Sequence, residues 1–393
     1  MIQVGYCTNV HAGADLDAMR ANLARHALAV KRAVCPSEPL GVGLWLSASA
    51  AAQLRASGGV AEFAAWLAEA GLVPFTFNGF PYGDFHRDVV KYDVYRPTWC
   101  EASRVDYTLA LIEILDALLP KGIEGSISTV PLQWSAPAPS ADELAGAAAN
   151  LRRVAERLER LEMERGRLIY LCIEPEPGCV LERSSDLVDF FGRFLLGRRD
   201  DARVRRYLRV CHDVCHAAVM FEDQAEALGR YRAAGIGVGK VQVSSALALR
   251  LERLEPSGRA AALEELRAFA EGRYLHQTVV RRPPGESGSF TRFDDLPTAL
   301  ASTTRPSIPA SDWRIHFHVP IHLERIGRLE TTQPEIARCL EAARHAPGLQ
   351  HFEVETYAWQ VLPLALRPAS LSDGIACELA WFRDRFPDFW RRV

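Results

Sequence analysis

The chain has 393 residues, of which 48% are hydrophobic, so it can form one large domain or two of ordinary size. Its 46 basic and 49 acidic residues give a formal net charge of −3. This balance, without a long basic run, argues against a nucleic-acid-binding surface and against attachment to an anionic membrane.

The start of the chain, MIQVGYCTNVHAG, has neither the positive segment nor the long apolar stretch of a signal peptide. No run reaches the roughly 18 uncharged apolar residues that a membrane-spanning helix needs. The nine cysteines show no zinc-finger or CxxC spacing, which indicates buried, reduced thiols. We therefore expect a cytoplasmic protein that does not insert into a membrane.

Short apolar segments alternate with longer amphipathic segments along the chain. The short segments are apolar on both faces at their centres, which is typical of strands in a parallel sheet covered on both sides. We predict strands at 3–9, 41–47, 73–79, 125–132, 168–177, 207–213, 239–246, 314–320 and 351–357. We predict helices at 15–34, 58–71, 103–119, 141–164 and 334–346.

Repetition of strand, loop and helix predicts a (β/α)8 TIM barrel formed by a single domain over 1–393, with an open doubly wound sheet as the alternative. The nine predicted strands are one more than the eight strands of a TIM barrel. We expect an inserted flap at about 250–312, which leaves either 239–246 or 314–320 as the seventh barrel strand. The aromatic segment at 372–392 is expected to be a helix docked on the barrel, with a homodimer contact as the alternative.

Polar residues follow most of the predicted strands. In a TIM barrel the carboxyl ends of the strands and the loops after them form the active site, so these residues are candidates for function. They are Thr8, Asn9, His11, Asn78, Glu174, Glu176, Asp213, His216, Gln242, Ser244, His316, His318, His322, Glu353 and Glu355. Lys240 lies at the start of its strand instead, which indicates a structural role at the opposite end of the barrel.

Three of these residues are carboxylates that a barrel would bring together: Glu174, Asp213 and Glu355. Carboxylates gathered in a partly buried site repel one another unless they are neutralised, and no arginine lies at these strand ends. A divalent cation (Mn, Mg, Co, Fe or Zn) would neutralise them. The alternative for the sequence Asp213-x-x-His216 is a helix cap beside a hydrogen-bonded histidine.

The motifs GYCTNVHAG, FTFNGFPYGDFH, IYLCIEPEPG, CHDVCHAAVMFED, GKVQVSSAL, RYLHQTVV and HFHVP resemble the xylose-isomerase-like TIM barrel superfamily. This superfamily includes ketose 3-epimerases, inosose-processing enzymes and endonuclease IV. The whole chain also resembles the EboE family of metabolite traffic proteins. The resemblance implies that Glu174 and Glu355 are metal ligands and the catalytic acid and base.

The same resemblance implies that Asp213 is the second ligand and that His216 contacts substrate. The third ligand stays open, because spacing from Asp213 points to Gln242 and spacing back from Glu355 points to His318. Imidazole is the better ligand for a transition metal. The further substrate contacts are expected to be Asn78, His276, Gln277 and His316, with apolar walls from Trp45, Phe77, Phe80, Tyr82 and Trp134.

The predicted function is therefore a metal-dependent isomerase or epimerase of a sugar, cyclitol or sugar phosphate. One alternative is a non-catalytic carrier that keeps the barrel and binds a metabolite. An endonuclease-IV-like phosphodiesterase is a further alternative, although the charge balance argues against it. The pair Arg281 and Arg282 either contacts a substrate phosphate or lies on a solvated face of the flap.

Overall fold

Eight parallel strands close into a barrel in the computed structural model, which describes residues 2–282, 290–303 and 310–390. The order around the barrel follows the chain, and the last strand pairs with the first. The predicted (β/α)8 TIM barrel is therefore confirmed. The strands are β1 (Gln3–Cys7), β2 (Leu40–Leu44), β3 (Leu72–Asn78), β4 (Gly125–Thr129), β5 (Ile169–Ile173), β6 (Leu208–Asp213), β7 (Val238–Val243) and β14 (His351–Val354).

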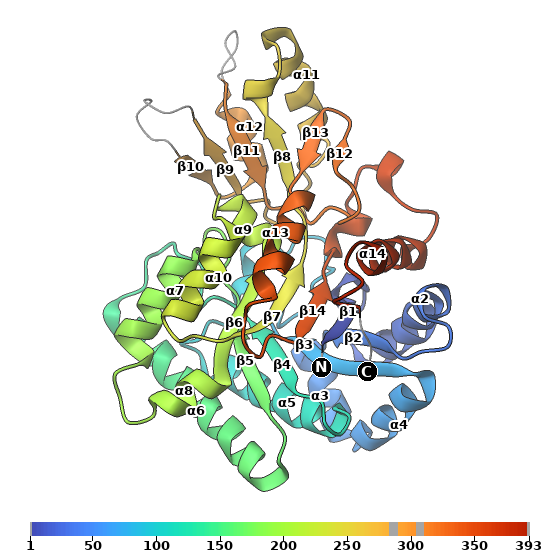
Figure 1. Cartoon of the computed structure of the whole chain (residues 1–393), viewed down its shortest axis with the longest axis vertical. Helices are drawn as coiled ribbons and strands as arrows, with labels where there is room; N and C mark the ends of the chain where they lie inside the picture. Colours follow the sequence, from blue (N-terminus) through green and yellow to red (C-terminus); the bar gives the residue numbers. More distant parts are fainter. Residues whose placement is uncertain (1, 283–289, 304–309, 391–393) are drawn as a thin grey trace.

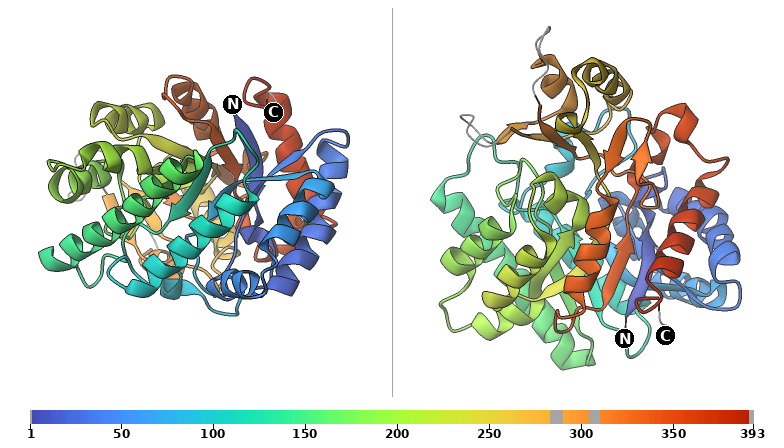
Figure 2. Two further views of the ribbon diagram at one scale, coloured as in Figure 1. Left: turned by 90° about the horizontal axis from the view of Figure 1, so that it is seen from below. Right: turned by 45° about the horizontal axis from the view of Figure 1, so that its top comes forward.

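Helices surround this barrel and bury its outer face (Figure 1, Figure 2). Helix α6 shows how local sequence sets their ends: Ser140 and Glu143 form a reciprocal cap at its start, and Gly166 ends it with a φ of 66°. The outer helices are α1 (Leu16–Asn22), α2 (Leu28–Val34), α3 (Ala48–Ala56), α4 (Val60–Ala70), α5 (Ala102–Leu118), α6 (Ala141–Arg165), α7 (Ser184–Phe190), α8 (Asp201–Tyr207), α9 (Val214–Val219), α10 (Gln224–Ala233) and α13 (Gln333–Ala343).

A second, antiparallel sheet covers the end of the barrel where the parallel strands finish, at the top of Figure 1. All its strands lie in the chain between β7 and α13, so the insertion extends beyond the predicted range of 250–312 on both sides. In sheet order they are β10 (Phe290–Phe293), β9 (Thr278–Arg281), β11 (Asp312–Ile315), β8 (Leu247–Arg250), β13 (Leu329–Thr331) and β12 (Arg325–Ile326), accompanied by α11 (Pro256–Arg267) and α12 (Leu296–Ala301).

The ninth predicted strand belongs to this second sheet. The segment predicted at 314–320 forms β11, which ends at Ile315, and the following histidines lie in a loop. The seventh barrel strand is therefore β7, because it pairs with both β6 and β14. Two parts of the predicted flap, 283–289 and 304–309, lie outside the described residues.

The C-terminal helix α14 (Leu371–Arg385) packs beside α2, and the two ends of the chain lie close together on the side of the barrel away from the second sheet (Figure 1, Figure 2). It is shorter than the predicted 372–392, of which 391–392 lie outside the described residues. All nine cysteines are free thiols. No helix among the described residues has the length and apolar character needed to cross a bilayer.

The interior of the barrel contains one complete ion pair. Lys240 Nζ lies 2.6 Å from Glu353 Oε2, and both side chains are fully buried. The pair needs the glycine at Gly43, because a Cβ there would lie 1.3 Å from Glu353 Oε1. The structure thus gives Lys240 the structural position expected from its place in the sequence.

Candidate active site

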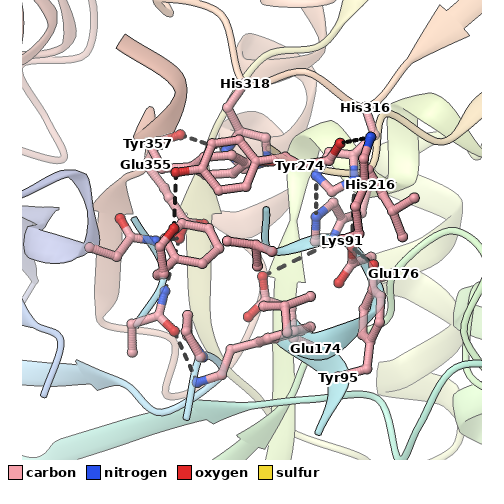
Figure 3. A pocket seen from close by; sticks show the side chains of 18 residues that line it. Lys91, Tyr95, Glu174, Glu176, His216, Tyr274, His316, His318, Glu355 and Tyr357 are labelled. Atoms are coloured by element: carbon pink, nitrogen blue, oxygen red, sulfur yellow. Dashed lines mark hydrogen bonds and ion pairs between the residues drawn. The ribbon is translucent and has the colours of Figure 1, made fainter. Parts of the chain in front are cut away.

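A pocket lies between the strand ends and the second sheet (Figure 3). Strand-end residues, the irregular segment 80–95 and residues near the second sheet all contribute side chains. The lining residues are Asn9, Asn78, Phe80, Pro81, Phe85, Val90, Lys91, Val94, Tyr95, Glu174, Glu176, His216, Tyr274, Leu275, His316, His318, Glu355 and Tyr357.

Three buried carboxylates meet at the bottom of this pocket. Oxygens of Glu174, Asp213 and Glu355 lie within 4.8 Å of one another. Burial, and then the negative charges of the neighbouring carboxylates, raise the pKa values of Glu174 and Glu355 well above the usual range. Among the described residues, no lysine or arginine forms an ion pair with any of the three.

The two carboxylate oxygens of Asp213 have different surroundings. It is the last residue of β6 and the N-cap of α9, where Oδ1 accepts the His216 N–H at 2.8 Å and the Ser244 hydroxyl at 2.8 Å. Oδ2 is buried and has no hydrogen-bond partner. Burial opposes ionisation of Asp213, but the neighbouring His216 and His318 and these hydrogen bonds outweigh it and lower its pKa. The cap and the metal-ligand interpretations of Asp213-x-x-His216 are therefore compatible.

Glu355 is held by two amide side chains from neighbouring strand ends. Asn9 Nδ2 donates to Glu355 Oε1 at 2.7 Å, and Asn78 Nδ2 donates to the same oxygen at 2.9 Å. Both amides fix the orientation of the carboxylate without neutralising it. Asn78, predicted as a substrate contact, lines the pocket but already holds Glu355.

Both alternatives for the third ligand lie next to this cluster. Gln242 is paired in register with Asp213 on one side and Glu353 on the other, so its side chain lies on the same face of the sheet as theirs. Its amide oxygen and nitrogen are both buried without a partner. His318 donates from Nδ1 to the Glu355 carbonyl at 2.8 Å, while Nε2 has no partner and lies 3.9 Å from Asp213 Oδ2.

These unpartnered atoms are a test of whether the residues fit a metal ion. A buried polar atom without a partner costs free energy and is rare in folded proteins. Here such atoms gather in one place, and they are the oxygen and nitrogen types that divalent cations bind. They are Glu174 Oε2, Asp213 Oδ2, both amide atoms of Gln242 and His318 Nε2. The residues present fit a divalent cation.

A second polar group lies beside the carboxylates, around Glu176. The Tyr95 hydroxyl donates to Glu176 Oε1 at 2.6 Å, and Gln277 Nε2 donates to the same oxygen at 3.0 Å. Gln277 Oε1 faces His316 Nδ1 at 2.7 Å. Gln277 thus lies behind the pocket-lining residues and supports them, although we predicted a substrate contact.

His276 was predicted to contact substrate, but it also lies behind the residues that line the pocket. Its Nδ1 bonds the His316 carbonyl at 3.0 Å and its Nε2 bonds Glu271 Oε1 at 2.8 Å. It is completely buried and does not line the pocket. His216 and His316, in contrast, do line it (Figure 3).

The apolar walls differ from those predicted. Phe80 lines the pocket, whereas Trp45, Phe77, Tyr82 and Trp134 do not. The walls also include Phe85, Tyr95, Tyr274 and Tyr357. These aromatic residues lie in irregular segments, where hydrophobic periodicity gives no signal.

The basic side chains at and near the pocket are already paired with carboxylates. Lys91, the one basic lining residue besides the histidines among those described, lies 2.6 Å from Asp295 Oδ2. Arg281 pairs with Asp312 at 3.0 Å and stacks on Phe221, away from the pocket. The structure therefore gives no support to phosphate binding by Arg281.

No protein-family model and no curated protein matches the sequence. Solved structures share the fold. An L-ribulose 3-epimerase is 12% identical with a TM-score of 0.50, and covers 99% of this chain and 94% of its own. A probable 3-DHS dehydratase, AsbF of Bacillus anthracis, is 12% identical with a TM-score of 0.50, at 98% and 100% coverage.

Another solved structure, the IOLI protein with a bound zinc atom, is 11% identical with a TM-score of 0.51 and 100% coverage of both chains. A xylose isomerase-like TIM barrel protein from Mycobacterium smegmatis in complex with magnesium is 11% identical with a TM-score of 0.50 and 97% coverage of both. At these identities the comparisons show the fold alone, a TIM barrel. The resemblance to the EboE family stays a prediction.

Proposed function

We propose that the protein is a metal-dependent isomerase or epimerase of a small sugar or cyclitol. The observation that carries this proposal is the buried cluster of Glu174, Asp213 and Glu355, which no described lysine or arginine pairs with. Glu174 and Glu355 also line the pocket. A structural role for three such groups would be costly, because without a cation their burial and mutual repulsion are relieved only by taking up protons, the direction in which the pKa values of Glu174 and Glu355 are shifted.

Glu174 and Glu355 are the acid and base of the proposed reaction. One carboxylate removes a proton from the carbon beside a substrate carbonyl, and the other returns a proton to the substrate. Burial and the neighbouring carboxylates raise their pKa values, which makes each a stronger base when it is ionised. Asn9 and Asn78 keep Glu355 oriented toward the pocket while it gains and loses the proton.

The proposed metal ligands are Glu174, Asp213 and Glu355, with Gln242 or His318 as a further ligand. A divalent cation at these residues would polarise a substrate carbonyl and neutralise the carboxylates. The oxygen-rich set suits Mg or Mn, and a histidine would favour Co, Fe or Zn. The solved neighbours with zinc and magnesium are consistent with this range.

The pocket favours a neutral substrate over a phosphorylated one. Besides acidic residues and histidines, the lining contains one lysine, Lys91, which is already paired with Asp295. The aromatic walls offer apolar surface to the C–H face of a ring. The names of two solved neighbours, an epimerase and a dehydratase, fit a small carbohydrate-like substrate.

The first experiment is to measure bound metal after purification and after reconstitution, in wild type, in Glu174→Gln and in Asp213→Asn. We expect tightly bound divalent metal in wild type and at least a tenfold loss of affinity in each variant. Glu162→Gln, which alters a carboxylate paired with Arg206 on the outer helices, serves as the control. Wild-type protein that binds no metal even after reconstitution would overturn the proposal.

The second experiment tests catalysis. Candidate ketoses and inososes are incubated with the metal-loaded protein in deuterated water, and deuterium at the carbon beside the carbonyl is measured by NMR. We expect incorporation in wild type and its loss in Glu355→Gln. Saturable binding without any exchange would favour the non-catalytic carrier instead.

A further inference from the structure

The side chains that line the pocket use most of their hydrogen-bond donors inside the protein. The amide groups of Asn9 and Asn78 donate to Glu355 Oε1, at 2.7 Å and 2.9 Å. The Tyr274 hydroxyl donates to the Phe85 carbonyl at 3.1 Å. These donors hold the lining together and are not directed at a ligand.

The cationic side chain and the second tyrosine are engaged in the same way. Lys91 Nζ donates to a backbone carbonyl and to Asp295 Oδ2, both at 2.6 Å. The Tyr95 hydroxyl donates to Glu176 Oε1 at 2.6 Å. Few side-chain donors, such as the Tyr357 hydroxyl, therefore remain for a ligand.

The three histidines of the lining also have their N–H groups engaged. Nδ1 of each faces a backbone or amide carbonyl oxygen, at 2.9 Å for His216, 2.7 Å for His316 and 2.8 Å for His318. A carbonyl oxygen only accepts hydrogen bonds, so Nδ1 carries the hydrogen of each neutral ring. Nε2 of His216 and His316 then face each other at 3.1 Å, and Nε2 of His318 is an acceptor.

Acceptor atoms are left over in the pocket instead of donors. Asn9 Oδ1, Glu174 Oε2 and His318 Nε2 are buried and have no partner. A phosphate group brings only further acceptors, and a sugar hydroxyl brings one donor with two acceptor lone pairs. An ammonium group brings three donors, no acceptor and a positive charge, so it matches this lining best.

Glu176 is the lining carboxylate that lies outside the proposed metal cluster (Figure 3). The Tyr95 hydroxyl and Gln277 Nε2 both donate to its Oε1, so neither of them uses Oε2. Its side chain keeps 7% of its surface exposed, and it forms no ion pair with a lysine or arginine in the part of the chain that the structure describes.

Charge favours the same ligand class. A divalent cation at the cluster supplies two positive charges for three carboxylates, and Glu176 adds a further acidic group. Burial raises the pKa of Glu176, whereas His216 and the donors from Tyr95 and Gln277 oppose this rise. A positive group beside Oε2 would favour the ionised form further.

The aromatic walls suit an organic cation as well. A ring face attracts a cation that lies within about 6 Å of its centroid. The pocket is lined by five aromatic side chains: Phe80, Phe85, Tyr95, Tyr274 and Tyr357. A carboxylate combined with ring faces is therefore available to one ammonium group.

We infer that the substrate is an amino sugar or an aminocyclitol, with its ammonium group bound by Glu176 against the aromatic walls. This inference rests on the proposed function and names its substrate class. The charge that disfavours a phosphorylated substrate thus also favours a positively charged substrate over a neutral one. Glu174 and Glu355 keep the proton-transfer role, two residues or more away from the group that binds the amine.

The test compares amines with their parent hydroxyl compounds on the full-length, Mn²⁺-treated protein by titration calorimetry. The pairs are D-glucosamine and D-glucose, D-galactosamine and D-galactose, 1-amino-1-deoxy-D-fructose and D-fructose, and scyllo-inosamine and scyllo-inositol. We expect at least one amine to bind tenfold or more tightly than its parent, as for one hydrogen-bonded charged pair. Its N-acetyl derivative, which has no charge, should lose this advantage.

Glu176→Gln keeps an acceptor for Tyr95 and removes the charge, so it should abolish the preference for the amine. Glu182→Gln is the matched control, because Glu182 follows the same strand but pairs with Arg292 outside the pocket and should keep the preference. A preference that persists in Glu176→Gln would contradict the assignment to Glu176. Thermal melts identify a variant that fails to fold.

The outcomes separate this inference from the proposed function. If no amine of the panel binds more tightly than its parent, including the case in which none binds, the inference is wrong. Bound metal and deuterium exchange are measured on the same wild-type protein, so the metal centre and the proton transfer are judged independently of that result.

A measurement on wild type needs no variant. The ratio of amine affinity to parent affinity is determined as pH rises through the pKa of the amine itself. The ratio should fall toward one as the amine becomes neutral, with the parent compound correcting for any effect of pH on the protein. A ratio that does not change with pH would exclude recognition of an ammonium group.

Discussion

Glu353 and Glu355 are two residues apart at the end of β14, and both side chains are buried, but their surroundings differ in charge. Glu353 has its own cation, with Lys240 Nζ at 2.6 Å. Glu355 has two amide donors and two other carboxylates, and no described cation. One layer of the barrel is thus neutralised by the chain itself, whereas the next layer is left for a cation to neutralise.

The comparison extends to a third buried carboxylate, Glu378 on α14. It accepts hydrogen bonds from the Ile321 N–H at 2.9 Å and from the Thr356 hydroxyl at 2.6 Å. Burial raises its pKa to about 7, so a proton partly neutralises it. The protein therefore has three solutions for a buried carboxylate: a lysine, a proton and, as we propose, a metal ion.

The largest expected effect comes from removing the lysine. Lys240→Met leaves Glu353 charged and buried, so the free energy of unfolding should fall by about 3–5 kcal/mol. Urea denaturation followed by circular dichroism measures this. The double variant Lys240→Met/Glu353→Gln should recover most of the loss, and a single variant as stable as wild type would contradict the role of the ion pair.

The proton on Glu378 should make stability depend on pH. Its folded pKa of about 7 is above the ordinary 4.5, so the unfolded chain releases this proton first and stability falls as pH rises from about 4.5 through 7. At about 1.4 kcal/mol per pKa unit the loss is on the order of 3 kcal/mol. Glu378→Gln should lose this contribution, so its stability relative to wild type rises from pH 4.5 to 8. An unchanged difference across this range would exclude the protonated carboxylate.

Bound divalent metal should stabilise the carboxylate cluster, in the way that a lysine stabilises Glu353 and a proton stabilises Glu378. Divalent metal at about 100 times its dissociation constant should stabilise wild type by about 2.7 kcal/mol, measured as a shift in denaturation midpoint that a chelator reverses. In Lys240→Met the same metal increment should persist, because the ion pair lies one layer deeper. An equal shift in Glu355→Gln would show that the stabilising metal binds elsewhere.

Prediction from sequence succeeded where a residue's place depends on the strand pattern alone. Glu174, Asp213 and Glu355 follow apolar runs, and parallel strands in a closed barrel bring their ends together, so their convergence was predictable. We predicted that His316 lies at the carboxyl end of a strand that could belong to the barrel, but this segment belongs to the second sheet. Register between sheets depends on tertiary packing, which periodicity does not record.

The parts that sequence missed lie in irregular segments. Tyr95, which bonds Glu176, comes from a short 3-10 helix at Lys91–Tyr95, and nothing in its local pattern marks it. His276 and Gln277 carried a polar signal of the right kind, but that signal does not distinguish a lining residue from a supporting one. The distinction depends on which side of β9 and its preceding loop faces the pocket.

The smallest expected effect concerns the amides that hold Glu355. Asn9→Ala removes the 2.7 Å hydrogen bond to Glu355 Oε1 and leaves Asn78 as the remaining amide donor. Supporting hydrogen bonds of this kind typically change metal affinity by about 10–100-fold, so Asn9→Ala should weaken metal binding by about tenfold because Asn78 compensates in part. Asn9→Asp should bind metal more tightly than Asn9→Ala if negative charge were the requirement. A need for a donor predicts that Asn9→Asp binds no more tightly than Asn9→Ala, because neither side chain can donate to Glu355. Metal titration of the two variants distinguishes a carboxylate that is oriented by amides from one that merely adds to the local charge.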